Sequence, residues 1–537
     1  MKNHTIHIDK TRFPGKISFS TIFNAAVHMV DRHPSEGRAE KIVVRCVDGE
    51  TVTYQQLQQR VNQCGNYLLA RGFKSGDRIL IILKDCPEFF YLFWGAIKVG
   101  VIPVPINTIL RSKDYPFFID DLQCKGLFYS GTYSNKVLPA IEAAQHKPGN
   151  IVAVDAGDGS LASDLNSYSD RLEAHLSSPD DECFILYSSG STGNPKGAVH
   201  SHRNLIVPCI RFGEQSLKLK ADDVIYSAAK LFFAYGLCGA NNFVLWTGAS
   251  VILDSQRPTP ESIVRLMQIH QPSIFYGVPT LYAGLLQLGS QQPFDLSSLR
   301  LCTSAGEALP PELFEQWKRM TGLHLLDGIG STENLSHFLS NPIGKAKEGT
   351  SGVEIPGYRA KIIDLEGNEL PPGEAGQLII KGESMAMEYW NNPEKSAQTM
   401  VNGWLYTGDI YSKDEHGYFH CHGRNDDMLK VGGIWCSPLE IEGKLFEHKG
   451  VLEAAVIGAP DANGLIKPKA FVVTKEKVDN IQKFKDELRE LCKNGLAPYK
   501  YPRWFEIVDE LPKTATGKVQ RFRLREGESN HLNPSEK

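Results

Sequence analysis

A run of small residues and hydroxyls with one lysine is the stretch of this sequence best suited to chemistry. It reads Tyr187-Ser188-Ser189-Gly190-Ser191-Thr192-Gly193-Asn194-Pro195-Lys196-Gly197 and follows a short apolar run, 183–187, with strand character. Successive small residues let consecutive backbone N–H groups point into one concavity, which suits phosphate oxygens. The side-chain hydroxyls add donors, and Lys196 adds a positive charge that can follow a polyphosphate. The stretch therefore predicts a phosphate-binding loop.

The composition of this stretch also fits a simpler alternative. The order G-x-x-x-x-G-K-[ST] is absent, so it is not the usual nucleoside-triphosphatase loop. On composition alone, a surface turn rich in Gly and Ser is favoured. The neighbouring residues have to decide between the two interpretations.

Two further Gly-rich turns follow predicted strands. Residues 299–304 read as a strand that runs into Gly306-Glu307-Ala308, and 323–327 as a strand that runs into Asp327-Gly328-Ile329-Gly330-Ser331-Thr332-Glu333. In open α/β sheets, ligands collect where strands end in such loops. The loops at 188–197, 304–310 and 327–333 are therefore expected to share one crevice.

The elements that would position these loops alternate between strand and helix. A hairpin is expected at 45–51, and Thr53 is expected to cap a helix that ends near Gly72. Strands are predicted at 79–83, 101–105 and 126–130, and helices at 88–99 and 135–144. Residues 1–50 read as a lead-in segment and 155–170 as an exposed connection. The alternation predicts a parallel sheet flanked by helices.

The pattern of predicted elements changes from about residue 350. Short strands between Gly and Pro turns, at 358–364 and 376–381, predict a β-rich subdomain. A boundary is expected in the charged, turn-prone stretch 423–427. Beyond it, helices at 438–446 and 481–493 and strands at 454–458, 469–473 and 504–508 predict a small α+β unit, with 526–537 frayed. The expected domains are 1–425 and 426–537, in an α/β fold overall.

Length, charge and cysteine content exclude several functional classes. A chain of 537 residues is expected to form two or more domains. The net charge of −4 and pI of about 6.5 give no electrostatic footprint for nucleic acid. No apolar run suggests a secretory signal or a membrane span. The 11 cysteines are scattered and form no C-x-x-C pair, which favours reduced thiols in the cytoplasm over disulfides or a zinc site. The pairs His200/His202 and His420/His422 lack an obvious third metal ligand.

The motif sequences resemble those of the acyl-adenylate-forming superfamily. The stretch 188–197 resembles the phosphate-loop signature of that family, and Pro512-Lys513-Thr514-Ala515-Thr516-Gly517-Lys518-Val519-Gln520-Arg521 resembles its catalytic-lysine motif. The resemblance runs from about Thr53 to Arg521, with the motifs in the family's order. It implies an enzyme with a large domain and a small mobile C-terminal domain. It also implies that ATP, Mg²⁺ and coenzyme A take part and that the protein is a monomer or homodimer.

The resemblance implies roles for individual residues around ATP. It makes Lys518 the catalytic lysine, Glu333 the Mg²⁺-binding acid and Thr332 a neighbour of the phosphates. It places Asp409 on the ribose, Asp327 on the adenine amino group, Arg424 near the phosphate and ribose, and Gly306, Glu307 and Ala308 in the nucleotide site. Ile329 stands where many members have a stacking Tyr. Each of these residues, taken alone, is also typical of a solvated loop or turn.

Just past the expected boundary, the resemblance marks residues for the second substrate. Asp426 matches the family's hinge position, although a surface acid beside Asp427 is the plain alternative. In Leu429-Lys430-Val431-Gly432-Gly433-Ile434-Trp435, the two glycines permit close backbone approach by a narrow substituent. Lys430, Gly432 and Gly433 are thus implied to line the pantetheine tunnel, whereas an ordinary Gly turn is the alternative.

Within the superfamily, the benzoate–CoA ligase branch is the most similar. This resemblance rests on the sequences of residues 227–236, 327–333 and 430–435. It implies an acyl pocket lined by Ala234, Tyr235, Gly328, Gly330, Ser336 and His337. A flat aryl ring suits a slot with Gly on one wall and an aromatic ring on the other, although Phe232, Phe233 and Tyr235 fit core packing equally well.

Ser336 departs from the branch and bears on the acid. Benzoate-type members tend to have His at this position, so the smaller Ser leaves room for a substituted benzoate, with 2-aminobenzoate favoured. Two other functions remain open: loading of a carrier protein's pantetheine arm instead of CoA, and a catalytically dead adenylate-binding regulator. The retained Lys196, Glu333, Asp409 and Lys518 argue against the regulator.

Overall fold

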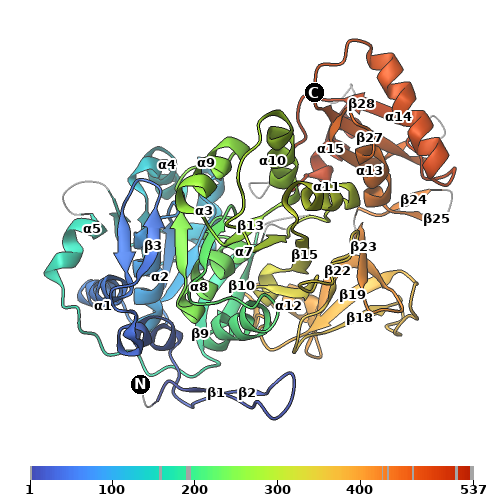
Figure 1. Cartoon of the computed structure of the whole chain (residues 1–537). Coiled ribbons are helices and arrows are strands. Elements are labelled where there is room, and N and C mark those ends of the chain that lie inside the picture. The colour runs from blue at the N-terminus through green and yellow to red at the C-terminus, as the bar shows by residue number, and fades with distance from the viewer. Residues whose placement is uncertain are drawn as a thin grey trace.

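The structure, a computed structural model, describes residues 3–155, 160–188, 195–425, 427–431, 434–461, 465–513 and 518–532, with backbone alone for 430, 434, 435 and 527–532. Figure 1 shows a large body in blue, green and yellow and a smaller, red C-terminal unit beside one end of it. No helix among the described residues is long and apolar enough to cross a membrane. The α/β class predicted from the alternation of strands and helices is confirmed.

A nine-stranded sheet forms the centre of the large body. Its order is β17-β16-β15-β14-β13-β11-β12-β3-β4. The strands are β3 (Ile42–Cys46), β4 (Thr51–Thr53), β11 (Val224–Ser227), β12 (Ser250–Leu253), β13 (Ile274–Gly277), β14 (Leu301–Ser304), β15 (Leu325–Gly330), β16 (His337–Ser340) and β17 (Val353–Glu354). The six strands from β15 to β3 run parallel, and the outer strands β4, β16 and β17 are antiparallel. The parallel strands bring their carboxyl ends, and hence their loops, to one edge.

A second, four-stranded parallel sheet lies in the N-terminal part. Its order is β6-β5-β7-β8, with β5 at Arg78–Ile82, β6 at Ile102–Pro105, β7 at Gly126–Tyr129 and β8 at Asn150–Ala153. The helices between its strands and before them are α1 (Tyr54–Ala70), α2 (Pro87–Lys98), α3 (Tyr115–Leu122) and α4 (Ser134–Ala143). Thr53 caps α1 through a capping box with Gln56, as predicted. α2 is apolar around nearly its whole circumference because it is buried on all sides.

A short antiparallel sheet carries the predicted phosphate loop. β9 (Glu182–Ser188) and β10 (Lys196–Ser201) form its hairpin, and β20 (Glu388–Tyr389) pairs with the outer edge of β10. The strand predicted at 183–187 is confirmed, and the loop residues 189–194 lie outside the described part of the chain. The hairpin thus fixes the two ends of the loop, Ser188 and Lys196, opposite one another in register.

The β-rich subdomain and the small C-terminal unit follow as predicted. The subdomain contains β18 (Arg359–Ile363), β19 (Gly376–Lys381), β21 (Met400–Val401), β22 (Trp404–Lys413) and β23 (Phe419–Arg424). The C-terminal unit contains β24 (Leu429–Val431), β25 (Ile434–Cys436), α13 (Pro438–Phe446), β26 (Val451–Pro460), β27 (Ile466–Thr474), α14 (Ile481–Gly495), β28 (Trp504–Ile507) and α15 (Arg521–Leu532). It has its own apolar core, which includes Val456, Val472 and Leu488.

Three predictions about the ends and connections are wrong. The lead-in segment is an integral part of the fold, because β3 pairs with β12 inside the main sheet and Phe23, Met29 and Val44 are fully buried. The connection at 155–170 contains the short helix α5 (Leu161–Asp164), which buries Leu161. The tail expected to fray from 526 is helical as far as Leu532. In the first two segments, tertiary packing overrides what the local composition suggested.

Candidate active site

One cleft of about 2600 Å³ connects the large body with the C-terminal unit. The described ends of all three Gly-rich loops line it: Ser188, Pro195 and Lys196, then 305–313, then 327–333. Parts of β22 and β23 and the segment 518–523 complete its walls. The shared crevice predicted from the strand ends is therefore confirmed for these residues.

The phosphate end of the cleft is organised around Glu333. Its Oε1 accepts a hydrogen bond from the Tyr389 hydroxyl at 2.7 Å and a longer one from Ser188 Oγ at 3.4 Å. Lys196 Nζ lies 5.8 Å from the centroid of the same Tyr389 ring. Tyr389 thus contacts both the cation and the carboxylate that the sequence placed at the polyphosphate, and β20 holds it against the loop hairpin.

A buried histidine fixes the turn that carries Thr332 and Glu333. His200, in β10, lies 2.9 Å through Nε2 from the carbonyl oxygen of Thr332, and its Nδ1 accepts from Asn204 Nδ2 at 3.0 Å. These partners make Nε2 the protonated nitrogen. Burial lowers the pKa of His200 to about 4, so the ring is neutral at neutral pH. His200 therefore has a structural role, and the described residues supply no third ligand that would make it part of a metal site.

Asp409 and Arg424 lie opposite one another on neighbouring strands. Asp409 in β22 pairs in register with Arg424 in β23, and Arg424 Nη1 donates to Asp409 Oδ1 at 3.1 Å. The Asp409 side chain is 15% exposed, toward the cleft. Burial raises its pKa, and the nearby Arg424 and Lys518 offset part of this shift. The carboxyl oxygens of Asp409 therefore lie at the cleft, where they can accept hydrogen bonds from a diol.

Asp327 ends the parallel part of β15 at the base of the cleft. It is only 4% exposed, and its Oδ1 has no hydrogen-bond partner among the described residues. Burial raises the pKa of this carboxyl well above its usual value. Ser304 stands beside it in β14, and its Oγ is likewise unpartnered within the described part of the chain. Such buried, unsatisfied groups are costly without a ligand, so they favour a polar ligand here.

The nucleotide-side loops surround Asp327. Ile329 is half-buried and lines the cleft, so an apolar side chain occupies the wall where the family often has Tyr. The loop Gly306, Glu307 and Ala308 lines it as well. Gly306 has φ of +98°, a conformation that favours glycine. The structure thus gathers in one cavity all the described residues that were predicted for the nucleotide.

Lys518 reaches this cavity from the C-terminal unit. A Cβ atom placed on Gly306 would lie 3.9 Å from Lys518 Cε, which shows how closely the lysine approaches the loop after β14. The next residue, Val519, donates its backbone N–H to Glu307 Oε1 at 2.9 Å. The exposed ammonium of Lys518 therefore lies on the same side of the cleft as the nucleotide loops.

An apolar pocket branches from the cleft below β15. Tyr235 forms its wall, and the ring is held because its hydroxyl hydrogen-bonds with Thr303 Oγ1 at 2.7 Å. The His337 ring lies 5.5 Å from that of Tyr235 and stacks on Phe212 at 4.4 Å. Ala234 and Ser336 also line the pocket, together with Cys238, Phe243 and Tyr276, which the motifs did not mark. Phe232 and Phe233 line the same cleft, although Phe232 is only 5% exposed.

Gly328 and Gly330 line the cleft and lie directly against the start of β16. A Cβ on Gly328 would lie 2.6 Å from the Leu339 carbonyl oxygen and 2.7 Å from His337 Cδ2. A Cβ on Gly330 would meet the Ser336 carbonyl oxygen at 2.5 Å. Glycine is therefore required at both positions by close approach of β16. Ser336 Oγ and His337 Nε2 are buried and have no partner in the described ranges.

Several predicted site residues lie outside the described part of the chain. These are Ser189, Gly190, Ser191, Thr192 and Gly193 of the phosphate loop, the hinge residue Asp426, and Gly432 and Gly433. The backbone of Lys430 belongs to β24, which pairs with β25 beyond the β23 edge. Their predicted roles stay predictions.

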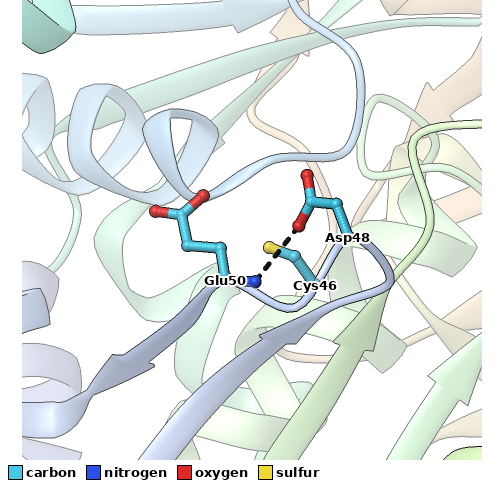
Figure 2. A group of neighbouring side chains, drawn as sticks. All are labelled: Cys46, Asp48 and Glu50. Carbon is cyan, nitrogen blue, oxygen red and sulfur yellow. Dashed lines mark hydrogen bonds between the residues drawn. The ribbon is translucent and has the colours of Figure 1, made fainter.

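The donor set around Glu333 fits Mg²⁺. A carboxylate, the hydroxyls of Thr332 and Ser188 and a polyphosphate offer only hard oxygen ligands, which Mg²⁺ prefers. The structure brings together another possible set, Cys46, Asp48 and Glu50, at the turn between β3 and β4 (Figure 2). There the Glu50 N–H donates to Asp48 Oδ1, and burial raises the pKa of the Cys46 thiol to about 12. Burial thus disfavours the thiolate that would bind a metal at this turn.

Two contacts were invisible to the sequence analysis. Tyr389 lies in a two-residue strand far along the chain, and only its pairing with β10 brings it to Glu333. Glu307 was assigned to the nucleotide, and its bond to Val519 depends on how the two units are arranged. Neither contact leaves a local signal in composition or spacing.

Comparison with known proteins agrees with this site. Residues 31–390 match the family model described as AMP-binding enzyme, and residues 440–518 match that of the AMP-binding enzyme C-terminal domain. The chain therefore belongs to the AMP-binding enzyme family, and the resemblance to the acyl-adenylate-forming superfamily is confirmed.

The similar proteins extend over nearly the whole chain. A benzoate–CoA ligase of Thauera aromatica is 46% identical over 96% of this chain and 98% of its own length. The crystal structure of an anthranilate CoA ligase in complex with anthranoyl-AMP superposes with a TM-score of 0.91, at 38% identity, over 95% of this chain and 98% of its own. A benzoate CoA ligase from Burkholderia xenovorans LB400 superposes with a TM-score of 0.88, at 40% identity, over 94% and 100%.

Proposed function

We propose that this AMP-forming aryl-CoA ligase activates benzoate or a substituted benzoate, with 2-aminobenzoate as its preferred acid. The observation that carries the proposal is that Tyr235, His337 and Gly328 line the same cleft as the residues proposed for the phosphates and the ribose. A lining of this kind suits a flat aromatic acid whose carboxylate faces the nucleotide. The similar proteins named for benzoate and anthranilate support the same class of acid.

In the first half-reaction, an oxygen of the aryl carboxylate attacks the α-phosphorus of ATP. The bond from that phosphorus to the bridging oxygen breaks, and pyrophosphate leaves with the electron pair, so aryl-AMP forms. Lys518 is proposed to bridge the carboxylate and the α-phosphate, because an ammonium there offsets the negative charge that builds up. Asp409 is proposed to accept hydrogen bonds from the ribose hydroxyls. Asp327, whose pKa is raised by burial, is proposed to form a hydrogen bond with the edge of the adenine ring.

The phosphate end of the cleft is proposed to hold ATP through Lys196 and the loop 188–197. Glu333, with Thr332 beside it, would hold Mg²⁺, which when bound neutralises part of the charge of the phosphates. Tyr389 would orient Glu333 through the hydrogen bond to Oε1. These residues act by positioning and electrostatics, as is general in phosphoryl chemistry.

In the second half-reaction, the sulfur of CoA attacks the acyl carbon of aryl-AMP. The bond from carbon to the phosphate oxygen breaks, AMP leaves, and the thiol proton passes to solvent. We propose that 1–425 and 426–537 are the two domains and that the small one turns about Asp426 between the steps. This turn would bring Lys430, Gly432 and Gly433 to the pantetheine arm.

The choice of 2-aminobenzoate rests on the pocket beyond Gly330. Ser336 is small there, and its Oγ and His337 Nε2 are buried and without partners in the described part of the chain. An ortho amino group could supply a hydrogen bond to such a group, whereas unsubstituted benzoate leaves it unsatisfied. The buried polar atoms therefore favour a substituted ring.

The test is pyrophosphate and AMP release across a panel of acids, each with and without CoA. The panel is benzoate, 2-aminobenzoate, 2- and 4-hydroxybenzoate, cinnamate and a medium-chain fatty acid. CoA-dependent turnover that is highest with 2-aminobenzoate would support the proposal. Much better use of benzoate than of every ortho-substituted acid would overturn the preference, and adenylate formation that needs a carrier protein rather than CoA would favour carrier loading.

A further inference from the structure

A hydrogen bond joins the loop after β14 to the segment that carries Lys518. Glu307, in the loop after β14, accepts the backbone N–H of Val519 at Oε1, at 2.9 Å. The bond connects the large body to the residue directly after the lysine. The bond therefore fixes the course of the backbone next to Lys518, whose side chain lines the cleft.

The other end of the same segment is anchored within the C-terminal unit. Arg521 donates to both carboxylate oxygens of Glu442 in α13, through Nη2 at 2.8 and 2.7 Å. It also lies 3.6 Å from Asp427 Oδ2. Both side chains are largely buried, at 16% and 7% exposed for Arg521 and Glu442. The segment 518–521 is thus a short bridge with one end on each unit.

The groups that surround Glu307 come partly from the C-terminal unit. Burial raises the pKa of Glu307, and the Val519 N–H, Lys518 and Arg521 offset part of this shift, while Glu442 is a like charge that adds to it. The hydrogen-bond donor and the two cations all belong to the C-terminal unit. Glu307 therefore gains these partners only when that unit lies over the cleft as it does here.

We propose that Glu307 is a positioning residue that docks the Lys518 segment over the cleft for adenylation and has no part in thioester formation. The inference rests on the proposed two-step function. A carboxylate fixed to the large body can bind Val519 only in this arrangement of the two units. When the small unit turns to admit CoA, this hydrogen bond breaks, so its loss would leave the second step unchanged.

The test measures the two half-reactions separately in the full-length protein. Pyrophosphate release from ATP and acid in a single turnover reports adenylation, and CoA-dependent conversion of supplied aryl-AMP reports thioester formation. Glu307→Ala is expected to slow adenylation by about 10- to 100-fold, the usual effect of losing a hydrogen bond to a charged group. Thioester formation is expected to change by less than about threefold.

Three controls separate positioning from other roles. Glu307→Gln keeps an oxygen acceptor for the Val519 N–H and is expected to recover most of the adenylation rate. Glu453→Ala removes an acid paired with Lys513 in the same segment without a contact to Glu307, and both steps are expected to persist. In a Lys518→Ala background, Glu307→Ala is expected to slow adenylation little further, because the two residues act as one unit.

The outcomes distinguish this inference from the proposed function. Equal loss of both half-reactions in Glu307→Ala, or a weaker ATP affinity that accounts for the whole loss, would overturn the docking role. Additive losses in the double variant would do so as well. If the wild-type protein makes no aryl-AMP from any acid, the proposed function fails instead, independently of Glu307.

Discussion

At the scale of single residues, Lys518 carries the sharpest functional prediction. Its Cε lies 3.9 Å from the position of a Cβ on Gly306, and its charge lowers the pKa of Asp409, so it lies near the residues that we propose for the nucleotide. Lys518→Ala is expected to slow adenylation by about 10²- to 10³-fold, the usual cost of removing one preorganised charge-stabilising group. Conversion of supplied aryl-AMP with CoA is expected to stay within about threefold.

Lys513 provides the matched control for this variant. It lies in the same segment, but its Nζ is paired with Glu453 within the C-terminal unit. Lys513→Ala is therefore expected to spare both half-reactions, measured by the same pyrophosphate and thioester assays. Equal losses of the two steps in Lys518→Ala would contradict the role given to this lysine.

Ser336 is expected to set the preference for an ortho substituent. Its buried Oγ has no partner in the described ranges, so it is available to a polar group on the ring. Ser336→Ala is expected to lower kcat/KM for 2-aminobenzoate by about 2- to 10-fold, because one neutral hydrogen bond is lost. The value for benzoate is expected to be unchanged or slightly higher. The same loss for both acids in steady-state assays would contradict a role in recognising the substituent.

Where a motif carries them, the sequence predicted residues that the structure brings to one cleft, although their roles stay predictions. Asp409, Glu333 and Lys518 all face the cleft because each sits in a short stretch whose backbone course is set by Gly and by neighbouring strands. It could not predict Tyr389 or the Val519 contact of Glu307. Both depend on strands and units that lie far apart in the chain, and long-range register leaves no local pattern.

At the scale of elements, β15 determines the width of the acyl pocket. The strand passes so close to β16 that a Cβ at Gly328 would lie 2.6 Å from the Leu339 carbonyl oxygen and 2.7 Å from His337 Cδ2. Gly328→Ala is expected to destabilise the protein by about 1–3 kcal/mol, the usual cost of overpacking. The shifted His337 ring is expected to lower kcat/KM for aromatic acids at least about tenfold.

The control for this variant is Gly149→Ala. A Cβ there would meet only the Lys125 carbonyl oxygen, at 3.9 Å, so neither stability nor activity is expected to fall. Thermal unfolding and the acid panel measure both effects. A Gly328→Ala protein with wild-type use of benzoate would show that the slot at β15 does not hold the ring.

Element types were predictable where apolar periodicity was strong, as in α1, β5 and α2. Two elements near the ends of the chain were missed. β3 was missed as a sheet strand although its hairpin with β4 was predicted, since only β12, some 200 residues later, covers its other edge. Residues from 526 on were predicted to fray because they are polar, whereas residues 526–532 continue the helix α15.

At the scale of the whole molecule, buried histidines are expected to make stability depend on pH. Burial lowers the pKa of five of them, namely His28 to about 4, His33 to about 2, His200 to about 4, His202 to about 3 and His337 to about 3. In the unfolded chain each titrates near pH 6.5. Below that pH the unfolded state binds more protons than the folded state, so stability falls as the pH falls.

Buried carboxyls act in the opposite direction. Burial raises the pKa of Asp85, Asp327 and Asp409, so their neutral forms are favoured in the folded protein. As the pH falls toward the unfolded values near 4, these groups bind protons first in the folded state and restore some stability. The buried histidines named above outnumber these carboxyls. The Tm is therefore expected to fall as the pH is lowered from 7.5 to 5.5. A Tm that stays level or rises as the pH is lowered over this range would contradict the expected dominance of the histidines.

One histidine allows the balance to be tested at a single site. His202 Nδ1 accepts the Ala25 N–H at 3.1 Å, and an Asn side-chain oxygen can take over that bond without titrating. Below pH 6.5 each such histidine costs about 1.4 kcal/mol of stability for every pH unit. His202→Asn is therefore expected to reduce the loss of unfolding free energy between pH 6.5 and 5.5 by about 1 kcal/mol, measured by denaturant titration at each pH. An unchanged pH dependence in this variant would mean that His202 gains its proton in the folded state as readily as in the unfolded chain.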